Sequence, residues 1–175
     1  CSSGNSKMSK RLTLLRHAKS GWGEIGEADH ERVLSEKGEQ HALTLGRLLQ
    51  EQQLQPDRIV SSSAARAVQT ANLICRAMTT VDINTDSTLY LASPQALLDV
   101  AAAECDGNNH LMLVAHNPGM TELENQLSNV TLDNLPTCGI FCIDLNIESC
   151  SELLQPLNQS VNAFWSHYPS PPPST

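Results

Sequence analysis

Short apolar runs alternate along the chain with longer segments in which apolar residues recur at helical spacing. The runs are typical of buried strands, because they are brief, rich in Leu, Ile and Val, and end in polar loops or turns. They predict strands over residues 11–16, 58–60, 81–83, 110–115 and 139–147, and the last of these is expected to be the final strand.

The segments with helical spacing begin at residues that commonly cap helices. Ser35, Ser63 and Ser93 are the predicted N-caps of the first three helices, and a proline in the first turn strengthens the third. The predicted helices cover residues 36–49, 64–78, 94–105 and 120–127. Strands that alternate with helices predict an α/β fold, a three-layer α/β/α sandwich around a largely parallel sheet.

The length of 175 residues, of which 40% are apolar, suits one domain with a substantial core. We expect residues 8–168 to form this single domain. Residues 1–7 are small and polar and precede Met8, so we interpret them as a remnant foreign to the natural chain. The Pro/Ser-rich residues 169–175 predict an extended or disordered tail.

Charge and cysteine usage narrow the class of protein. A net charge of −8 and a pI near 5.1 disfavour nucleic acid and membrane surfaces as partners. No apolar run approaches the roughly 20 residues that a membrane-spanning helix needs. The six cysteines form no CxxC pair and no zinc-site spacing, so we expect free thiols in a reducing compartment. These features predict a cytoplasmic protein.

Three short segments carry the residues whose side chains can take part in catalysis, and each segment lies where an apolar run gives way to a polar loop. They are Leu-Arg-His-Ala-Lys-Ser at 15–20, a Ser-rich turn leading to Arg-Ala-Val-Gln-Thr-Ala at 61–71, and Val-Ala-His-Asn-Pro-Gly at 114–119. Ligands of open α/β sheets bind at the carboxyl ends of the strands. The sequence therefore predicts that Arg16, His17, Arg66 and His116 gather at one edge of the sheet.

Two histidines and two arginines suit phosphoryl transfer through a histidine. A neutral imidazole can attack phosphorus near neutral pH, and guanidinium forks bind the oxygens of the transferring group. Arg66 also stands in the first turn of its predicted helix, where backbone N–H groups favour an anion. We predict no metal and no other cofactor, because no third histidine or carboxylate has ligand spacing and the arginines would repel a cation.

In these three segments the chain resembles the histidine phosphatase superfamily, which has the phosphoglycerate-mutase-like fold. Arg16-His17-Ala18 matches the family's Arg-His-Gly at the end of the first strand. The Ser-rich turn before Arg-Ala-x-x-Thr-Ala and the strand that ends in His116 match the second and third motifs. Leu34-Ser35-x-x-Gly38 also fits, so the resemblance covers residues 12–117.

Within this superfamily the chain looks most similar to the short phosphohistidine phosphatases. This similarity rests on the motif Arg-His-Ala-Lys-Ser, on the small size of the chain and on the Leu-Tyr pair at 89–90 before Ser93. The resemblance implies that His17 is the nucleophile and that Arg16, Arg66 and His116 form the phosphate pocket. It also implies a phosphohistidine of a phosphotransfer protein as the substrate.

Two departures from the family pattern bear on the substrate. Ala18 replaces the family's glycine, which we expect to restrict close backbone approach on that side. Residues 85–91 hold no glutamate where the mutase and sugar-phosphatase branches carry an acidic proton donor. An alkoxide leaving group needs that proton, whereas a phosphorylated imidazole leaves more easily. The sequence thus favours phosphohistidine over phosphoglycerate, with Asp29 or Glu31 as a hypothetical substitute donor.

The sequence as a whole predicts a metal-independent phosphatase with a covalent phosphohistidine intermediate. Its predicted substrate is phosphohistidine in a protein, such as a histidine phosphotransfer domain of a signal transduction system. Ser20 and Asn117 are predicted to contact the substrate. Two alternatives stay open: a phosphomonoesterase for sugar or nucleotide phosphates, and a phosphate- or protein-binding module without turnover.

Overall fold

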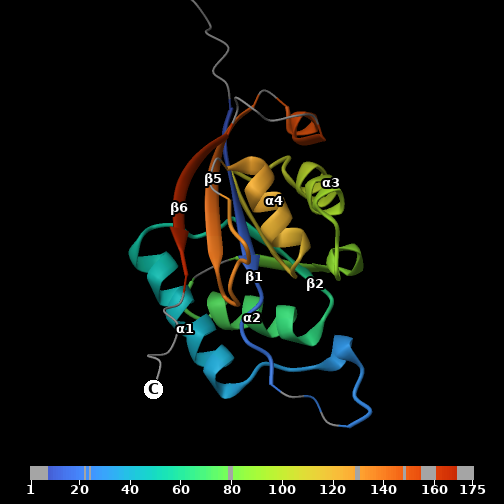
Figure 1. The fold of residues 1–175 in the computed structure, drawn as a ribbon. Coiled ribbons are helices and arrows are strands. Elements are labelled where there is room, and N and C mark those ends of the chain that lie inside the picture. The colour runs from blue at the N-terminus through green and yellow to red at the C-terminus, as the bar shows by residue number, and fades with distance from the viewer. Residues whose placement is uncertain are drawn as a thin grey trace, which may run out of the picture.

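Alternating buried strands and amphipathic helices assemble around one sheet, with strand order β3-β2-β4-β1-β5-β6, in the computed structural model (Figure 1). The structure describes residues 8–21, 23, 25–78, 81–128, 131–147, 149–154 and 161–168. The predicted remnant at 1–7 and the predicted tail at 169–175 lie outside the described residues. The strands are β1 (Met8–Arg16), β2 (Arg58–Ser62), β3 (Asp82–Asp86), β4 (His110–Ala115), β5 (Ile140–Ile147) and β6 (Val161–His167).

The sheet is largely parallel, which confirms the predicted fold class. Strand β1 pairs parallel with β4, β4 with β2, and β2 with β3. Strand β5 runs antiparallel to β1, and β6 runs antiparallel to β5. The prediction that residues 139–147 form the final strand was wrong, because β6 follows. The error has a structural reason. Strand β6 lies at the edge of the sheet, and its hydrogen bonds to β5 cannot be predicted from the local sequence pattern.

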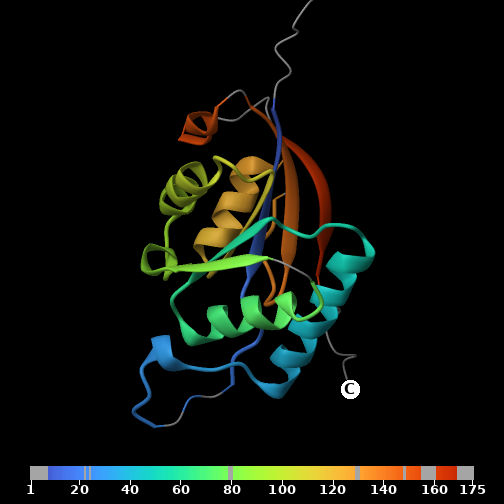
Figure 2. The ribbon, with the colours of Figure 1, turned by 180° about the vertical axis from the view of Figure 1, so that it is seen from behind.

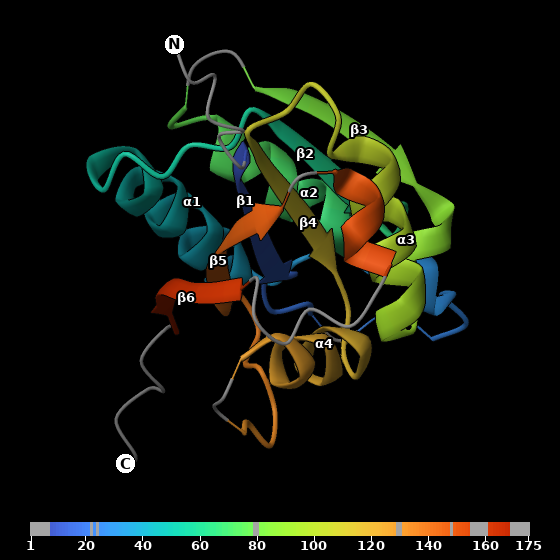
Figure 3. The same cartoon turned by 90° about the horizontal axis from the view of Figure 1, so that it is seen from above.

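Helices cover both faces of the sheet and give it three layers (Figure 3). Two core clusters fill the spaces between the layers. One joins α1 and α2 to residues such as Leu15 and Val114, and the other joins α3 and α4 to residues such as Leu14 and Leu113. Neighbouring residues of one strand thus face opposite layers, as the strand period requires. The helices are α1 (Glu36–Glu51), α2 (Ala65–Cys75), α3 (Pro94–Glu104) and α4 (Gly119–Leu127).

Three short 3-10 turns complete the described architecture: η1 (Asp29–Glu31), η2 (Ser87–Leu89) and η3 (Cys150–Leu154). Helix α2 and the loop that carries η1 both lie at the carboxyl end of β1 (Figures 1 and 2). Ser35 and Ser93 cap α1 and α3 through their side chains, as predicted. Ser63 does not cap α2, because its hydroxyl hydrogen-bonds His30 Nε2 at 2.8 Å and the N-cap position falls on Ala64.

Gly38 lets the start of α1 pack directly on the loop that follows β1. A Cβ at this position would collide with the carbonyl oxygen of Lys19. The same oxygen accepts hydrogen bonds from Ser35 N, at 2.9 Å, and from Ser35 Oγ, at 3.1 Å. The Leu-Ser-x-x-Gly pattern therefore has a physical reason: the helix start fixes the loop that leaves the carboxyl end of β1.

The Gly38→Ala variant is expected to lose about 3 kcal/mol of unfolding free energy, because the added methyl meets backbone that cannot yield. Urea denaturation measures this loss. Gly21→Ala is the matched control in the same loop, since its Cβ would lie 3.9 Å from Ser35 Cα and needs no rearrangement. Equal stabilities of the two variants would show that α1 does not depend on this close approach.

A disulfide joins Cys105, at the end of α3, to Cys150 in η3, so the prediction of free thiols was wrong for this pair. The two residues stand 45 positions apart, and only the folded topology brings them together. Cys75, Cys138 and Cys142 are free thiols, as predicted. The cytoplasmic location was inferred from thiol usage, so it loses part of its support and stays a prediction. No helix of the described part of the chain is long and apolar enough to span a bilayer.

Candidate active site

The carboxyl ends of three adjacent parallel strands bring the predicted residues together. His17 directly follows β1, His116 directly follows β4, and Ser62 is the last residue of β2. The rings of His17 and His116 lie 5.0 Å apart between centroids. Arg66, in the first turn of α2, reaches the same point. The predicted gathering of the three segments at one edge is therefore present in the structure.

The ring of His17 is oriented by its neighbour in the chain. Its Nδ1 lies 2.7 Å from the carbonyl oxygen of Ala18, which can only accept, so Nδ1 carries the hydrogen. The lone pair is thereby left on Nε2, which receives the Nε–H of Arg66 at 3.3 Å. His17 is 7% exposed, and burial, together with the charges of Arg66 and Arg16, lowers its pKa to about 4. The imidazole is thus neutral and nucleophilic at pH 7.

Thr70 supports this orientation, and sequence reasoning assigned it no role. The backbone N–H of Ala18 donates to Thr70 Oγ1 at 3.0 Å, and that hydroxyl donates to the carbonyl oxygen of Arg66 at 2.7 Å. The methyl of Ala18 is fully buried in the cluster beneath α1 and α2. The threonine of the Arg-Ala-x-x-Thr-Ala pattern was the available signal, because it ties the second motif to the first.

His116 presents an unpaired nitrogen beside His17. Its Nε2 lies 2.7 Å from Ser62 Oγ. The Ser62 hydroxyl has no other acceptor among the described contacts, so we assign it as the donor and Nε2 as the acceptor. The Nδ1–H is then an unused donor, and Nδ1 is buried without a partner among the described residues. Burial, followed by the proximity of His17, lowers the pKa of His116 to about 3. A neutral ring with a free N–H suits an incoming oxyanion.

Arg16 offers a second unpaired donor at the site. Its Nη1 donates to the carbonyl oxygen of Leu135 at 2.8 Å, whereas its buried Nε has no partner among the described residues. Buried donors normally find acceptors, so two unsatisfied ones from Arg16 and His116 indicate a place for a ligand with acceptor oxygens. Backbone carbonyls and phosphate groups both supply acceptor oxygens. Of the two, only a phosphate group can arrive from solution.

The two predicted substrate contacts bond elsewhere. The amide nitrogen of Asn117 donates to Leu135 O at 2.9 Å, and its oxygen accepts the hydroxyl of Thr121 at 2.8 Å. Asn117 therefore holds the segment on which Arg16 rests. Ser20 Oγ accepts from Arg32 Nη2 at 3.1 Å. Among the described interactions, neither side chain bonds His17, so their substrate contacts stay predictions.

Asp29 is unsuited to the role of substitute acid. Its Oδ2 accepts from Tyr90 Oη at 2.5 Å and from Arg66 Nη2 at 3.0 Å. The hydrogen bond from Tyr90, followed by the bond and charge of Arg66, lowers the pKa of Asp29 to about 2. The carboxylate is ionised at pH 7 and has no proton to give. Glu31 hydrogen-bonds His30 at the surface, at 3.3 Å.

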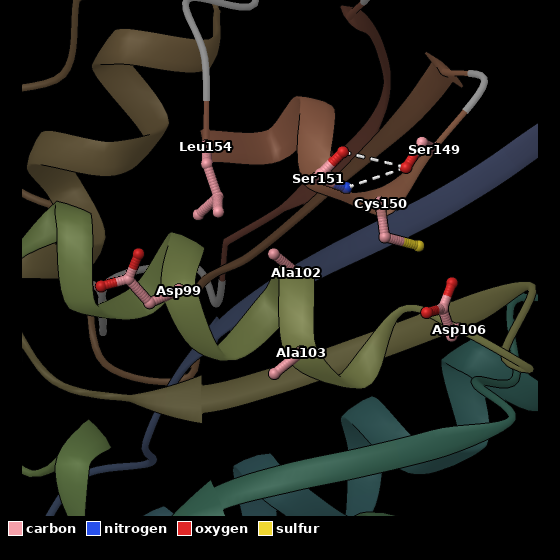
Figure 4. Close-up of a pocket in the computed structure, with 8 residues that line it drawn as sticks. All are labelled: Asp99, Ala102, Ala103, Asp106, Ser149, Cys150, Ser151 and Leu154. Carbon is pink, nitrogen blue, oxygen red and sulfur yellow. Dashed lines mark hydrogen bonds between the residues drawn. The ribbon is translucent and has the colours of Figure 1, made fainter.

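A pocket of about 400 Å³ lies away from this site, between α3 and η3 beside the disulfide (Figure 4). It adjoins the amino end of β4, opposite the edge that carries His116. Among the described residues its lining holds no histidine or arginine, which are the groups that phosphoryl transfer through a histidine needs. Its lining residues are Asp99, Ala102, Ala103, Asp106, Ser149, Cys150, Ser151 and Leu154.

Stability is expected to fall between about pH 6.5 and pH 4. In the unfolded chain histidines bind protons below about pH 6.5. In the folded protein His17 and His116 stay neutral until the pH falls to about 4 and about 3, respectively. Acidification therefore favours the unfolded state, by about 2 kcal/mol per histidine at about pH 5. Urea denaturation at pH 7 and at about pH 5 measures this loss of unfolding free energy. Between pH 7 and about pH 5, His17→Ala should lose about 2 kcal/mol less than the wild type, and an equal loss would contradict the buried, neutral ring.

A family model and a solved structure both show that this chain is similar to histidine phosphatases. Residues 12–90 match the family model for the histidine phosphatase superfamily (branch 1). The structure assigned as phosphohistidine phosphatase SixA from Agrobacterium tumefaciens superposes with a TM-score of 0.78 at 30% identity, over 91% of this chain and 98% of that one.

Curated relatives add two further similarities. Phosphoglycerate mutase 1 of Saccharomyces cerevisiae is 42% identical over 67 residues, which are 36% of this chain and 26% of the mutase. An uncharacterised chloroplast protein of Arabidopsis thaliana is 28% identical over 152 residues, 78% of this chain and 67% of that protein. The chain thus matches nearly the whole SixA structure but only about a quarter of the mutase.

Proposed function

Because this chain belongs to the histidine phosphatase superfamily, and to its short SixA-like branch, we propose that it dephosphorylates phosphohistidine in a protein through a phosphohistidine of its own. One observation carries the proposal. The Nε–H of Arg66 lies 3.3 Å from His17 Nε2, the ring of His116 lies 5.0 Å from that of His17, and two buried donors of this group of residues, Arg16 Nε and His116 Nδ1, have no partner among the described residues. A phosphoryl group between these residues would satisfy all three donors.

The reaction takes two displacements at phosphorus. His17 Nε2 attacks in line, the bond between phosphorus and the substrate's imidazole breaks, and its electron pair stays on the departing nitrogen. Water then attacks the phosphorus on His17, and the electron pair of the broken P–N bond returns to Nε2. The attacking water releases one proton to solvent, which balances the proton that the departing imidazole nitrogen takes up from solvent. The arginines and His116 stabilise the equatorial oxygens in both steps, which is where most of the catalysis of phosphoryl transfer lies.

The leaving group decides between the substrate classes. A sugar or nucleotide alkoxide requires a general acid within hydrogen-bond reach. Asp29 contacts Arg66 with its carboxylate, and Tyr90 and Arg66 keep that carboxylate ionised. A phosphorylated imidazole departs with less help, which supports phosphohistidine. The likeness to the SixA structure from Agrobacterium tumefaciens supports the same choice, and both the substrate and the cytoplasmic location remain proposals.

Phosphate release from three donors in EDTA tests the proposal: a phosphorylated histidine phosphotransfer domain, free phosphohistidine, and p-nitrophenyl phosphate. We expect release without a divalent metal and the highest kcat/KM for the phosphorylated domain. A preference for the phosphomonoester, p-nitrophenyl phosphate, would instead identify a small-molecule phosphomonoesterase. Phosphate binding without release from any donor would identify a binding module.

A further inference from the structure

We infer that Asp29 is a positioning residue, which clamps the outer edge of the Arg66 guanidinium so that its Nε–H stays beside the reacting nitrogen of His17, where the oxygens of the transferring group would lie. The inference deepens the proposed function and rests on it. It assigns Asp29 a role opposite to that of a proton donor, because the carboxylate acts as an anion throughout the reaction.

The geometry of Arg66 divides its donors between two tasks. Nη1 donates to the backbone oxygen of Asp29 at 2.7 Å and Nη2 to its Oδ2 at 3.0 Å, so one residue holds both ends of the outer edge. The remaining Nε–H donates to His17 Nε2 at 3.3 Å. Arg66 is 5% exposed, and a planar fork fixed along one edge has its other edge fixed as well.

Asp29 is itself held from a third segment of the chain. Tyr90, which follows η2, donates its hydroxyl to Oδ2 at 2.5 Å, and Arg32 Nη1 approaches Oδ1 at 3.4 Å. The Tyr90 ring meets the ring of His116 edge-on, with centroids 5.4 Å apart. The Asp29–Tyr90 pair thus spans the loop after β1, helix α2 and the turn before α3, and closes them around the catalytic edge.

A carboxylate beside an oxyanion pocket also carries a cost. Its negative charge opposes an incoming phosphate dianion, even while it orients the arginine. Neutralising Asp29 should therefore separate the two effects. Substrate binding should not weaken, whereas the chemical step should slow, because a misplaced Arg66 no longer meets the transferring group.

The test variant is Asp29→Asn, assayed with aryl phosphates whose leaving groups differ in pKa. We expect kcat to fall about 10- to 100-fold, with a KM that is unchanged or lower. The ratio of variant to wild-type kcat/KM should be constant along the series. A loss that grows with leaving-group pKa would overturn the inference and make Asp29 the general acid, and an unchanged kcat would overturn it as well.

Two further variants sharpen the result. Glu31→Gln neutralises a carboxylate of the same 3-10 turn that bonds only His30 among the described contacts, and should leave kcat unchanged. Tyr90→Phe removes one hydrogen bond to Asp29 and should lower kcat about fivefold. Because both residues act through Arg66, the double variant Asp29→Asn/Tyr90→Phe should be no slower than Asp29→Asn alone. Additive losses would contradict a shared route.

A measurement without turnover keeps the inference separate from the proposed function. The Nε–H signal of Arg66 in a ¹H–¹⁵N spectrum should be sharp and slow to exchange in the wild type, and should broaden in Asp29→Asn while the remaining spectrum is retained. If the wild type releases no phosphate and this change still occurs, the proposed function fails and the clamp stands. An unchanged Arg66 signal overturns the clamp, whatever the activity.

Discussion

Replacing His17 with alanine is expected to lower kcat/KM for every phosphoryl donor by about 10⁴-fold or more. The residue supplies the attacking nitrogen, and no neighbour can take its place. His116, the nearest imidazole, keeps its Nε2 on Ser62 Oγ and presents an N–H, not a lone pair, to the pocket. The loss should therefore appear as missing phosphoenzyme and not as weaker binding. A phosphate titration should show that the His17→Ala protein still binds the anion.

Rapid quenching with a ³²P-labelled donor measures the intermediate directly. The wild type should trap an acid-labile, base-stable label, as expected of a phosphorylated imidazole, and His17→Ala should trap none. His41→Ala is the matched control, since His41 lies on α1 and takes no part in the contacts of the site. Label on His17→Ala would mean that another side chain is the nucleophile. Normal turnover without label would favour direct attack by water.

The position of the site could be predicted because it depends on chain topology. The apolar runs that precede His17 and His116 mark buried parallel strands, and such strands end at one edge of the sheet. The helix that begins near Arg66 follows from the same pattern. These features depend on period and sequence order, which a single sequence displays.

The missing features depend on contacts between segments far apart in the chain. Cys105 and Cys150 form a disulfide because α3 and η3 pack together, and their spacing carries no sign of it. Tyr90 and Asp29 are separated by 61 positions and meet only once the loop after β1 folds over α2. The substrate contacts of Ser20 and Asn117 stay predictions. Only the packed structure reveals that Ser20 Oγ accepts from Arg32 and that Asn117 donates to the backbone of Leu135.

Arg66→Ala is expected to lower kcat/KM about 10³-fold, the scale on which arginines stabilise phosphoryl transfer. Arg66→Lys should recover little of this loss, because a lysine keeps the charge without the planar fork. A lysine ammonium cannot face His17 Nε2 and at the same time hold the backbone oxygen and Oδ2 of Asp29, as the Arg66 guanidinium does. Steady-state kinetics on the two variants, with circular dichroism to confirm folding, measure the difference.

The control for Arg66 lies at the other end of the same helix. Arg76, the exposed C-cap residue of α2, contributes similar charge to the protein without reaching the site, so Arg76→Ala should keep wild-type kinetics. If Arg66→Lys were as active as the wild type, positive charge alone would suffice and the fork geometry would be irrelevant. That result would also remove the reason for Asp29 to hold the outer edge of the guanidinium, because a lysine has no second edge to orient. A large loss in Arg66→Lys, matched by a smaller one in Asp29→Asn, would instead place the orientation of this arginine at the centre of the reaction.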